Sequence, residues 1–150
     1  MGQSLVQNYI HIVFSTKFRQ PLIKSEFQEE LYNYLGGTCN QLNCQSLQVG
    51  GYYDHIHILC MLSKNITLVD LLEKVKSSSS KWMKQKSPAL KNFCWQNGYG
   101  AFSVSPSLVN TVINYIKNQY QHHSKKTFQD EFRDFLKNYN TEFNEKYVWD

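Results

Sequence analysis

The chain has 150 residues, of which 41% are hydrophobic and 19% are charged, and its formal net charge is +4. This length fits one compact domain, residues 1–150, and the composition argues against a disordered chain. No stretch approaches the roughly 18 consecutive apolar residues of a membrane span, and no secretory signal is recognisable at the start. We therefore expect a cytoplasmic protein with no membrane partner.

The cysteines suit that compartment as reduced thiols. Their spacings contain no C-x2-C pair, so they match no common zinc framework. A zinc site made of Cys39, Cys44, His55 and His57 is an alternative that the sequence leaves open. Cys60 lies in an apolar run, which favours a small core residue.

Basic residues concentrate in two stretches that contain no acid. Residues 74–129 hold nine lysines and no aspartate or glutamate, and a shorter stretch near the start holds Lys17, Arg19 and Lys24. Such segments can be simple solvated faces. Fifty-six residues without a carboxylate nevertheless favour a polyanionic partner, with the phosphate backbone of a nucleic acid as the first candidate.

Local patterns predict the first elements in chain order. Residues 8–16 alternate and are rich in β-branched and aromatic types, which predicts a strand. Residues 26–42, with Ser25 as the N-cap, predict a helix that the Gly36-Gly37 pair weakens or ends.

The middle of the chain predicts a hairpin and a second helix. Residues 45–62 read as two strands, the first reaching Val49, with a turn at Gly50-Gly51. Residues 67–85 predict a helix, although four consecutive serines are unusual in a helix interior.

The last third predicts strands followed by two helices. Residues 93–105 predict a short aromatic strand, a bend and another strand. Helices are expected over residues 107–123, with Pro106 near the start, and over residues 125–139, with Thr127 as the cap. The whole order matches an α+β sandwich with a split βαβ core, an antiparallel sheet with helices packed on one face.

His55 and His57 lie one residue apart in the stretch DHIHIL, residues 54–59. On a strand, residues i and i+2 point the same way, so both imidazoles share one face while Ile56 and Ile58 share the other. H-x-H alone is more often a pair of exposed or hydrogen-bonded histidines. A metal site needs a third ligand and a reacting group.

The predicted helix 107–123 offers candidates for both. Its apolar stripe is formed by Val109, Val112, Ile113, Ile116 and Tyr120. Tyr115 and Gln119 then fall on one flank of that stripe, one helical turn apart. Each by itself can be an ordinary surface residue, but together with H-x-H in a basic domain they form a recognisable constellation.

With these motifs the sequence resembles the single-tyrosine HUH transposases of small prokaryotic insertion sequences, the insertion-sequence-200 type. YIHIVFSTKFRQPLI resembles the opening strand and turn of that family, and VGGYYDHIHIL resembles its H-x-H strand. The remaining similar blocks are KVKSSSSKWM, WQNGYGAFSVS, YIKNQYQHHSKKTFQDEF and EKYVWD. The resemblance therefore extends almost from end to end.

The resemblance implies a ferredoxin-like (RRM-like) sheet, a homodimer, and cleavage and rejoining of single-stranded DNA at hairpin-bearing ends through a 5′-phosphotyrosine. By position it implies Tyr115 as the nucleophile. It also implies His55, His57 and Gln119 as ligands of a divalent cation, Mg²⁺ or Mn²⁺. No G-x-x-x-x-G-K-[ST] loop is present, which agrees with a strand exchange that needs no nucleotide cofactor.

Basic side chains are expected to contact the DNA backbone. The candidates are Lys17, Arg19, Lys74, Lys76, Lys81, Lys117 and His122. His122 and His123 can instead cap the end of their helix. Four aromatic residues can stack on unpaired bases, although we expect most of them in the core: Trp82, Trp95, Tyr99 and Phe102.

Other functions remain open at this point. One is a non-catalytic nucleic-acid-binding domain in which Tyr115 is idle, and another is a relative that processes chromosomal repeat hairpins. A replication nickase is disfavoured because Tyr115 and Gln119 follow H-x-H in the transposase order. The tyrosine helix can serve the histidines of its own chain or those of a second subunit.

Overall fold

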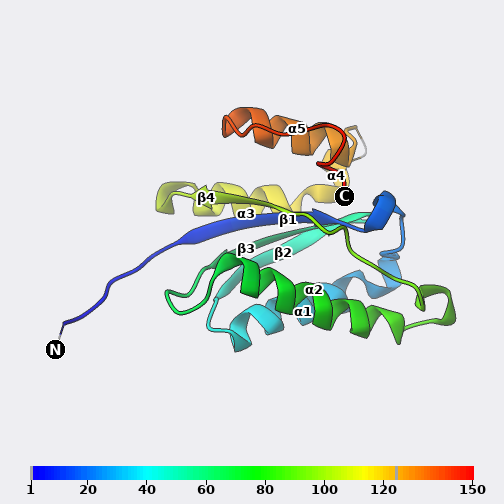
Figure 1. Ribbon diagram of the computed structural model, residues 1–150, viewed down its shortest axis with the longest axis horizontal. Coiled ribbons are helices and arrows are strands. Elements are labelled where there is room, and N and C mark those ends of the chain that lie inside the picture. Colours follow the sequence, from blue (N-terminus) through cyan, green and yellow to red (C-terminus); the bar gives the residue numbers. More distant parts are fainter. Residues whose placement is uncertain (1, 124) are drawn as a thin grey trace.

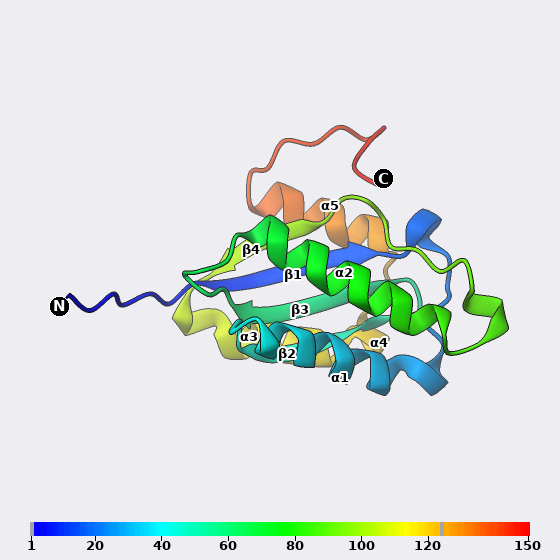
Figure 2. The same cartoon turned by 60° about the horizontal axis from the view of Figure 1, so that its bottom comes forward.

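A four-stranded antiparallel sheet forms the centre of the structure, a computed structural model that describes residues 2–123 and 125–150. The strands lie in the order β2-β3-β1-β4 (Figures 1 and 2). They are β1 (Tyr9–Ser15), β2 (Ser46–Tyr52), β3 (His55–Met61) and β4 (Gly100–Val104). β3 and β1 are central, so each pairs with a strand on both of its edges.

Helices cover both faces of this sheet. The five α-helices are α1 (Ser25–Gln41), α2 (Leu68–Lys84), α3 (Val109–Lys117), α4 (Gln119–His123) and α5 (Phe128–Asn138). Short 3-10 helices are Lys17–Arg19, Pro88–Leu90 and Pro106–Leu108. α1 and α2 lie on one face, and α3, α4 and α5 lie on the other (Figure 1). No helix among the described residues is long and apolar enough to cross a membrane.

The predicted α+β class is confirmed. Helices were predicted on one face of the sheet, and the structure has a second helical layer on the other face. The central strands are buried on both sides, and such strands need cover on both faces. Val13 of β1 packs with Phe128 and Phe132 of α5, and Leu59 of β3 packs with Ile116 of α3.

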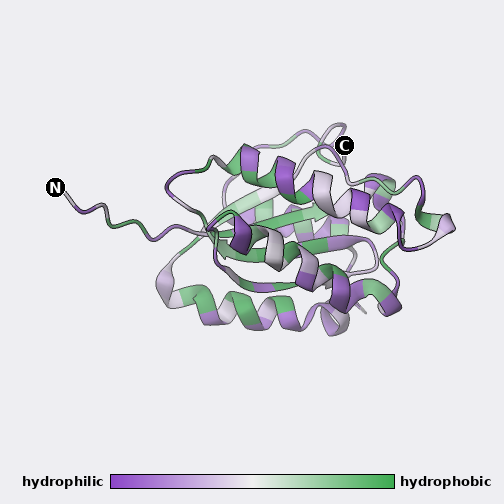
Figure 3. Cartoon of the chain, turned by 90° about the horizontal axis from the view of Figure 1, so that it is seen from below, coloured by the Kyte–Doolittle hydropathy of each residue, from purple (hydrophilic) through white to green (hydrophobic). Residues whose placement is uncertain are grey.

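The larger core lies between the sheet and the pair α1 and α2. Ile56 and Ile58 of β3 are fully buried there, and each such side chain contributes about 1.5–3 kcal/mol on burial. Cys39, Cys44 and Cys60 belong to this core. Figure 3 colours the strands mainly hydrophobic and α1 and α2 in alternating hydrophobic and hydrophilic segments, as amphipathic helices are. Cys39 and Cys44 pack in the core with Ile56 and Ile58, whereas His55 and His57 alternate with these isoleucines and point to the other face of β3, so the zinc alternative is wrong.

The predicted position of the β2–β3 turn is wrong. The β2–β3 turn is formed by Tyr53 and Asp54, while Gly50 and Gly51 lie inside β2. A Cβ on Gly51 would lie 2.2 Å from the His55 carbonyl oxygen, so the strand needs glycine for a close approach and not for a turn. The helix predicted over residues 26–42 is confirmed as α1, which continues through its glycine pair to Gln41.

The contrast between two glycines gives a stability prediction. Gly51→Ala is expected to lower the free energy of unfolding by about 1–3 kcal/mol, because the backbone beside His55 must move. Gly37→Ala is the matched control: the residue is exposed in α1, no atom lies within 4 Å of its added Cβ, and alanine favours the helix by about 0.5–1 kcal/mol. Urea unfolding of both variants measures the difference, and equal effects would contradict the close approach.

One predicted helix cap is confirmed, and one predicted helix is divided into two. The Thr127 hydroxyl accepts from the Asp130 amide and caps α5 as expected. α2 runs unbroken through its four serines, since hydroxyls such as that of Ser79 donate to carbonyls one turn back. The helix predicted over residues 107–123 is divided at Asn118 into α3 and α4.

Candidate functional site

β3 brings both histidines of the H-x-H motif to the face beneath α4 and α5. The two side chains are fully buried. The prediction that His55 and His57 share one face is therefore confirmed, whereas an exposed pair is excluded. Buried imidazoles require polar partners, and these come from β1, α4, α5 and the turn before β3.

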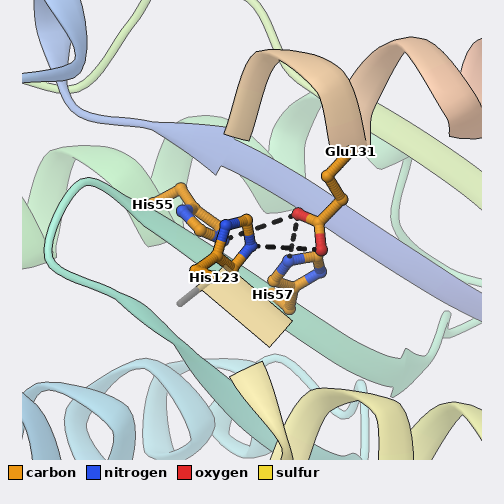
Figure 4. Close-up of side chains that lie close together, drawn as sticks. All are labelled: His55, His57, His123 and Glu131. Atoms are coloured by element: carbon orange, nitrogen blue, oxygen red, sulfur yellow. Dashed lines mark hydrogen bonds and ion pairs between the residues drawn. The ribbon is translucent and has the colours of Figure 1, made fainter. Parts of the chain in front are cut away.

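A single carboxylate lies at the centre of the cluster. Glu131 of α5 is only 2% exposed, and its Oε1 lies 3.1 Å from His57 Nε2 and 3.6 Å from His55 Nε2. Its Oε2 lies 3.2 Å from Nε2 of His123 in α4. Figure 4 shows the three rings and the carboxylate pointing toward one another.

The other ring nitrogen of each histidine is also engaged. His55 Nδ1 lies 2.7 Å from Asp54 Oδ1, and His57 Nδ1 lies 2.8 Å from Nε2 of His11 on β1. His123 Nδ1 lies 2.6 Å from a backbone carbonyl oxygen, that of residue 126. Partners of this kind fix the orientation of histidines that bind metals through the remaining nitrogen.

Tyr115 and Gln119 contact the same carboxylate. The Tyr115 hydroxyl donates to Glu131 Oε2 and lies 3.4 Å from His122 Nε2. The Gln119 amide nitrogen donates to Glu131 Oε2 over 3.3 Å, and its Oε1 lies 3.0 Å from His55 Nε2. A single chain thus brings together the two residues predicted on the helix flank and the two predicted on the strand.

Burial and the Glu131 charge shift the pKa values in this site. Burial lowers the pKa of His57, although Glu131 opposes that shift. Burial, reinforced by His57, lowers the pKa of His11 to about 3. Burial alone would raise the pKa of Glu131, but the surrounding histidines lower it overall. Burial and then Glu131 raise the pKa of Tyr115 above its usual value, so its phenol keeps its proton here.

Four side chains offer the donor set of a metal site. The ligand atoms of His55, His57, His123 and Glu131 all lie within 4.8 Å of one another. His123 Nε2 is buried and makes no hydrogen bond within the described residues, so a bound cation would satisfy it. Three imidazoles and a carboxylate fit a divalent transition metal.

Comparison with known proteins agrees with this arrangement. The model of the family described as "Transposase IS200 like" matches residues 4–119, which include Tyr115 and both histidines of H-x-H. The chain belongs to the IS200-like transposase family. The matched region of this IS200-like transposase ends before His123 and Glu131. No curated protein matches the chain.

Two solved structures share the fold of this IS200-like transposase. A protein of Deinococcus radiodurans R1 assigned as a transposase is 21% identical, with a TM-score of 0.62, and the match covers 79% of this chain and 96% of that one. A REP-associated tyrosine transposase bound to a REP hairpin is 12% identical, with a TM-score of 0.59, covering 82% of this chain and 73% of that one. At these identities the likeness concerns the fold.

The basic residues predicted to contact DNA do not share one surface of the transposase. Lys74 and Lys81 are exposed on α2, across the sheet from the histidines. Lys76 donates to three backbone carbonyls, those of residues 96, 97 and 98, and burial lowers its pKa to about 8. Lys17 lies 3.9 Å from Asp150, and the Arg19 guanidinium lies over the ring of residue 149. These two side chains therefore contact the C-terminal segment.

The remaining predicted contacts lie on the same face as the site. Lys117 is exposed at the end of α3, and His122 stands beside Tyr115. A cavity of about 490 Å³ opens next to them. Its lining is Tyr115, Asn118, Gln121, His122, Lys125 and Lys126. Lys125 and Lys126 thus adjoin the tyrosine, although sequence reasoning did not select them.

Of the aromatic residues considered for base stacking, Trp95 and Phe102 are buried, as expected. Trp82 stacks on Tyr34 with ring centroids 5.3 Å apart, and Tyr99 is half-buried. Trp95 and Phe102 therefore serve the core.

Proposed function

We propose that this IS200-like transposase cleaves and rejoins single-stranded DNA, with Tyr115 as the nucleophile. The observation that carries the proposal is the convergence of Tyr115 and Gln119 on His55 and His57 within one chain. A phenol beside a metal-binding histidine pair, with a lysine-lined cavity next to it, suits attack on a phosphodiester. Membership of the transposase family supports the same chemistry.

The reaction conserves the number of phosphate ester bonds. The Tyr115 oxygen forms a bond to phosphorus, the bond from phosphorus to the 3′-oxygen breaks, and that oxygen takes up a proton. The products are a 5′-phosphotyrosine and a free 3′-hydroxyl, which can later attack the same phosphorus and release Tyr115. His122 Nε2, 3.4 Å from the phenol oxygen, is placed to accept the phenolic proton, and burial lowers the pKa of His122, which favours its neutral form.

A divalent cation, Mg²⁺ or Mn²⁺, is the proposed cofactor. His55 and His57 would hold it through Nε2, with Gln119 Oε1 as the third ligand implied by the family resemblance. When bound, the cation supplies a Lewis acid that polarises the scissile phosphate and stabilises the leaving oxygen. Imidazole donors favour Mn²⁺ over Mg²⁺ in affinity.

The proposed partners are single-stranded DNA that carries a hairpin and a second copy of the chain. The REP-associated relative was solved with a hairpin, which supports the first. Leu108 is 52% exposed beside the half-buried Val109 and Val112 of α3, which gives this face the apolar character of a subunit contact.

The test is covalent capture of single-stranded DNA. Hairpin-bearing strands taken from the DNA that flanks the gene are incubated with the protein and Mn²⁺ or Mg²⁺, then denatured. Because the phosphotyrosine lies on the 5′ end of the downstream fragment, a 3′-label is expected to move to the protein and a 5′-label is not. The same sequences as full duplexes are the control. Binding without any adduct would favour the non-catalytic domain, and capture of chromosomal repeat hairpins alone would favour the repeat-processing relative.

A further inference from the structure

We propose that His123 and Glu131 complete a closed metal-binding set with His55 and His57, and that Glu131 occupies the place that the scissile phosphate takes during cleavage. The first half concerns metal binding alone. The second half rests on the proposed function. Both residues lie outside the region that matches the transposase family, which ends at residue 119.

At His123, two hydrogen-bond acceptors face one another, the ring Nε2 and the Glu131 carboxylate. The ring Nδ1 lies 2.6 Å from a carbonyl oxygen, which can only accept, so a neutral ring would carry its proton on Nδ1. Nε2 then bears a lone pair. This nitrogen belongs to a side chain that is 2% exposed, makes no hydrogen bond within the described residues, and lies 3.2 Å from Glu131 Oε2.

The same conflict occurs at His55. Its Nδ1 faces the Asp54 carboxylate at 2.7 Å and is therefore the protonated nitrogen. Its Nε2 lies 3.0 Å from Gln119 Oε1 and 3.6 Å from Glu131 Oε1, and both oxygens are acceptors. Lone pairs that converge in a buried site repel one another unless a proton or a metal cation lies between them.

The spacing of these atoms suits one metal ion. Metal–nitrogen and metal–oxygen bonds of about 2.0–2.2 Å in a tetrahedron place neighbouring ligand atoms about 3.4 Å apart. Glu131 Oε1 lies 3.1 Å from His57 Nε2 and 3.6 Å from His55 Nε2, and its Oε2 lies 3.2 Å from His123 Nε2. One ligand atom from each of the four residues lies within 4.8 Å of the others. All three rings have a fixed partner on the opposite nitrogen, as metal-binding histidines usually do.

Glu131 also lies where a substrate phosphate would approach the nucleophile. A phosphate approaching the nucleophile would meet Tyr115, Gln119 and His122. Glu131 Oε2 already accepts from the Tyr115 hydroxyl and the Gln119 amide and lies 3.1 Å from His122 Nε2. An anionic carboxylate thus holds the contacts that an anionic phosphate needs, so substrate and Glu131 compete for one place.

Cobalt titration tests the first half without any DNA. Co²⁺ is added to metal-free protein, and its d–d absorption, which is intense at four-coordinate sites and weak at six-coordinate ones, reports affinity and coordination. Glu131→Gln, which keeps the side-chain shape, and His123→Ala are each expected to lower Co²⁺ affinity by roughly ten- to hundredfold and to weaken the bands. Asp134→Asn, a half-exposed acid on the same helix that pairs with Lys126 outside the metal-binding set, is the control and is expected to change neither.

Unchanged affinity and spectrum in both variants would overturn the metal set and leave shared protons as the explanation of the cluster. Thermal unfolding of each metal-free variant, read by circular dichroism, checks that the fold persists. If His123→Ala does not fold, the nearly isosteric Glu131→Gln decides.

Phosphate competition tests the second half. Inorganic phosphate added to the Co²⁺ protein is expected to shift the spectrum at lower concentration in Glu131→Gln than in the wild type, because no anion has to leave. With saturating Mn²⁺, Glu131→Gln is expected to form at least as much DNA adduct as the wild type. Adduct reduced as far as by loss of Tyr115 would overturn the competition. If no protein forms an adduct, the proposed function fails, while the cobalt and phosphate titrations still decide the inference.

Discussion

Replacing Tyr115 with phenylalanine is expected to abolish transfer of 3′-labelled DNA to the protein, by roughly a thousandfold or more, because the nucleophilic oxygen is removed. The ring itself keeps its packing, with centroid distances of 5.7 Å to His57 and 5.8 Å to Phe135. Binding of the same strand is therefore expected to stay within about threefold, since backbone contacts supply most of the affinity. Adduct formation is read on denaturing gels and binding by fluorescence anisotropy.

Tyr120→Phe is the matched control for that experiment. Tyr120 lies five residues further along, is 43% exposed, and its hydroxyl donates to Gln28 Oε1 over 2.7 Å, away from the histidines. This variant is expected to keep cleavage. Cleavage that persists in Tyr115→Phe and disappears in Tyr120→Phe would assign the nucleophile to the other tyrosine.

Local sequence patterns were sufficient where the structure is determined locally. Alternation in residues 8–16 predicts β1, and Thr127 caps the last helix through the Asp130 amide as its position indicates. The β2–β3 turn was missed because glycine has two uses. Gly51 avoids a clash with the His55 carbonyl, a contact between strands that no local pattern contains.

Some residues of the site could likewise be predicted from the sequence, and others could not. Strand alternation put His55 and His57 on one face, and helical spacing together with the family resemblance selected Tyr115 and Gln119. Glu131 was not predicted as a site residue, because it lies 74 residues from His57 in the sequence and contacts it only when α5 packs over the sheet.

His11 and His123 were missed as partners of the cluster for a related reason. His11 meets His57 through the pairing of β1 with β3, and no spacing within one element indicates it. The sequence indicated that His123 caps the end of a helix. In the structure a new helix, α4, follows the break at Asn118, and the His123 ring lies beside the Glu131 carboxylate.

His57→Ala is expected to lower Mn²⁺ affinity by roughly a hundredfold or more and to remove cleavage, because the ring supplies a buried nitrogen 3.1 Å from the Glu131 carboxylate. Its side chain is fully buried and its far nitrogen is held by His11, so no neighbouring group can take its place without moving the strand. Calorimetric titration of metal-free protein with Mn²⁺ measures the affinity. Equal affinity in the variant and the wild type would show that His57 is not a ligand.

His122→Ala separates metal binding from proton transfer. His122 also lies near Glu131, at 3.1 Å, but its side chain is 29% exposed and its nitrogen also faces the Tyr115 hydroxyl at 3.4 Å. We expect Mn²⁺ affinity within about threefold of the wild type and slower adduct formation, since general acid–base groups contribute roughly a hundredfold or more. Loss of Mn²⁺ affinity instead would place His122 among the ligands.

Mn²⁺ affinity is also expected to fall as the pH is lowered, because metal-binding imidazoles must be neutral. The affinity that remains in His57→Ala is expected to depend on pH less steeply than that of the wild type.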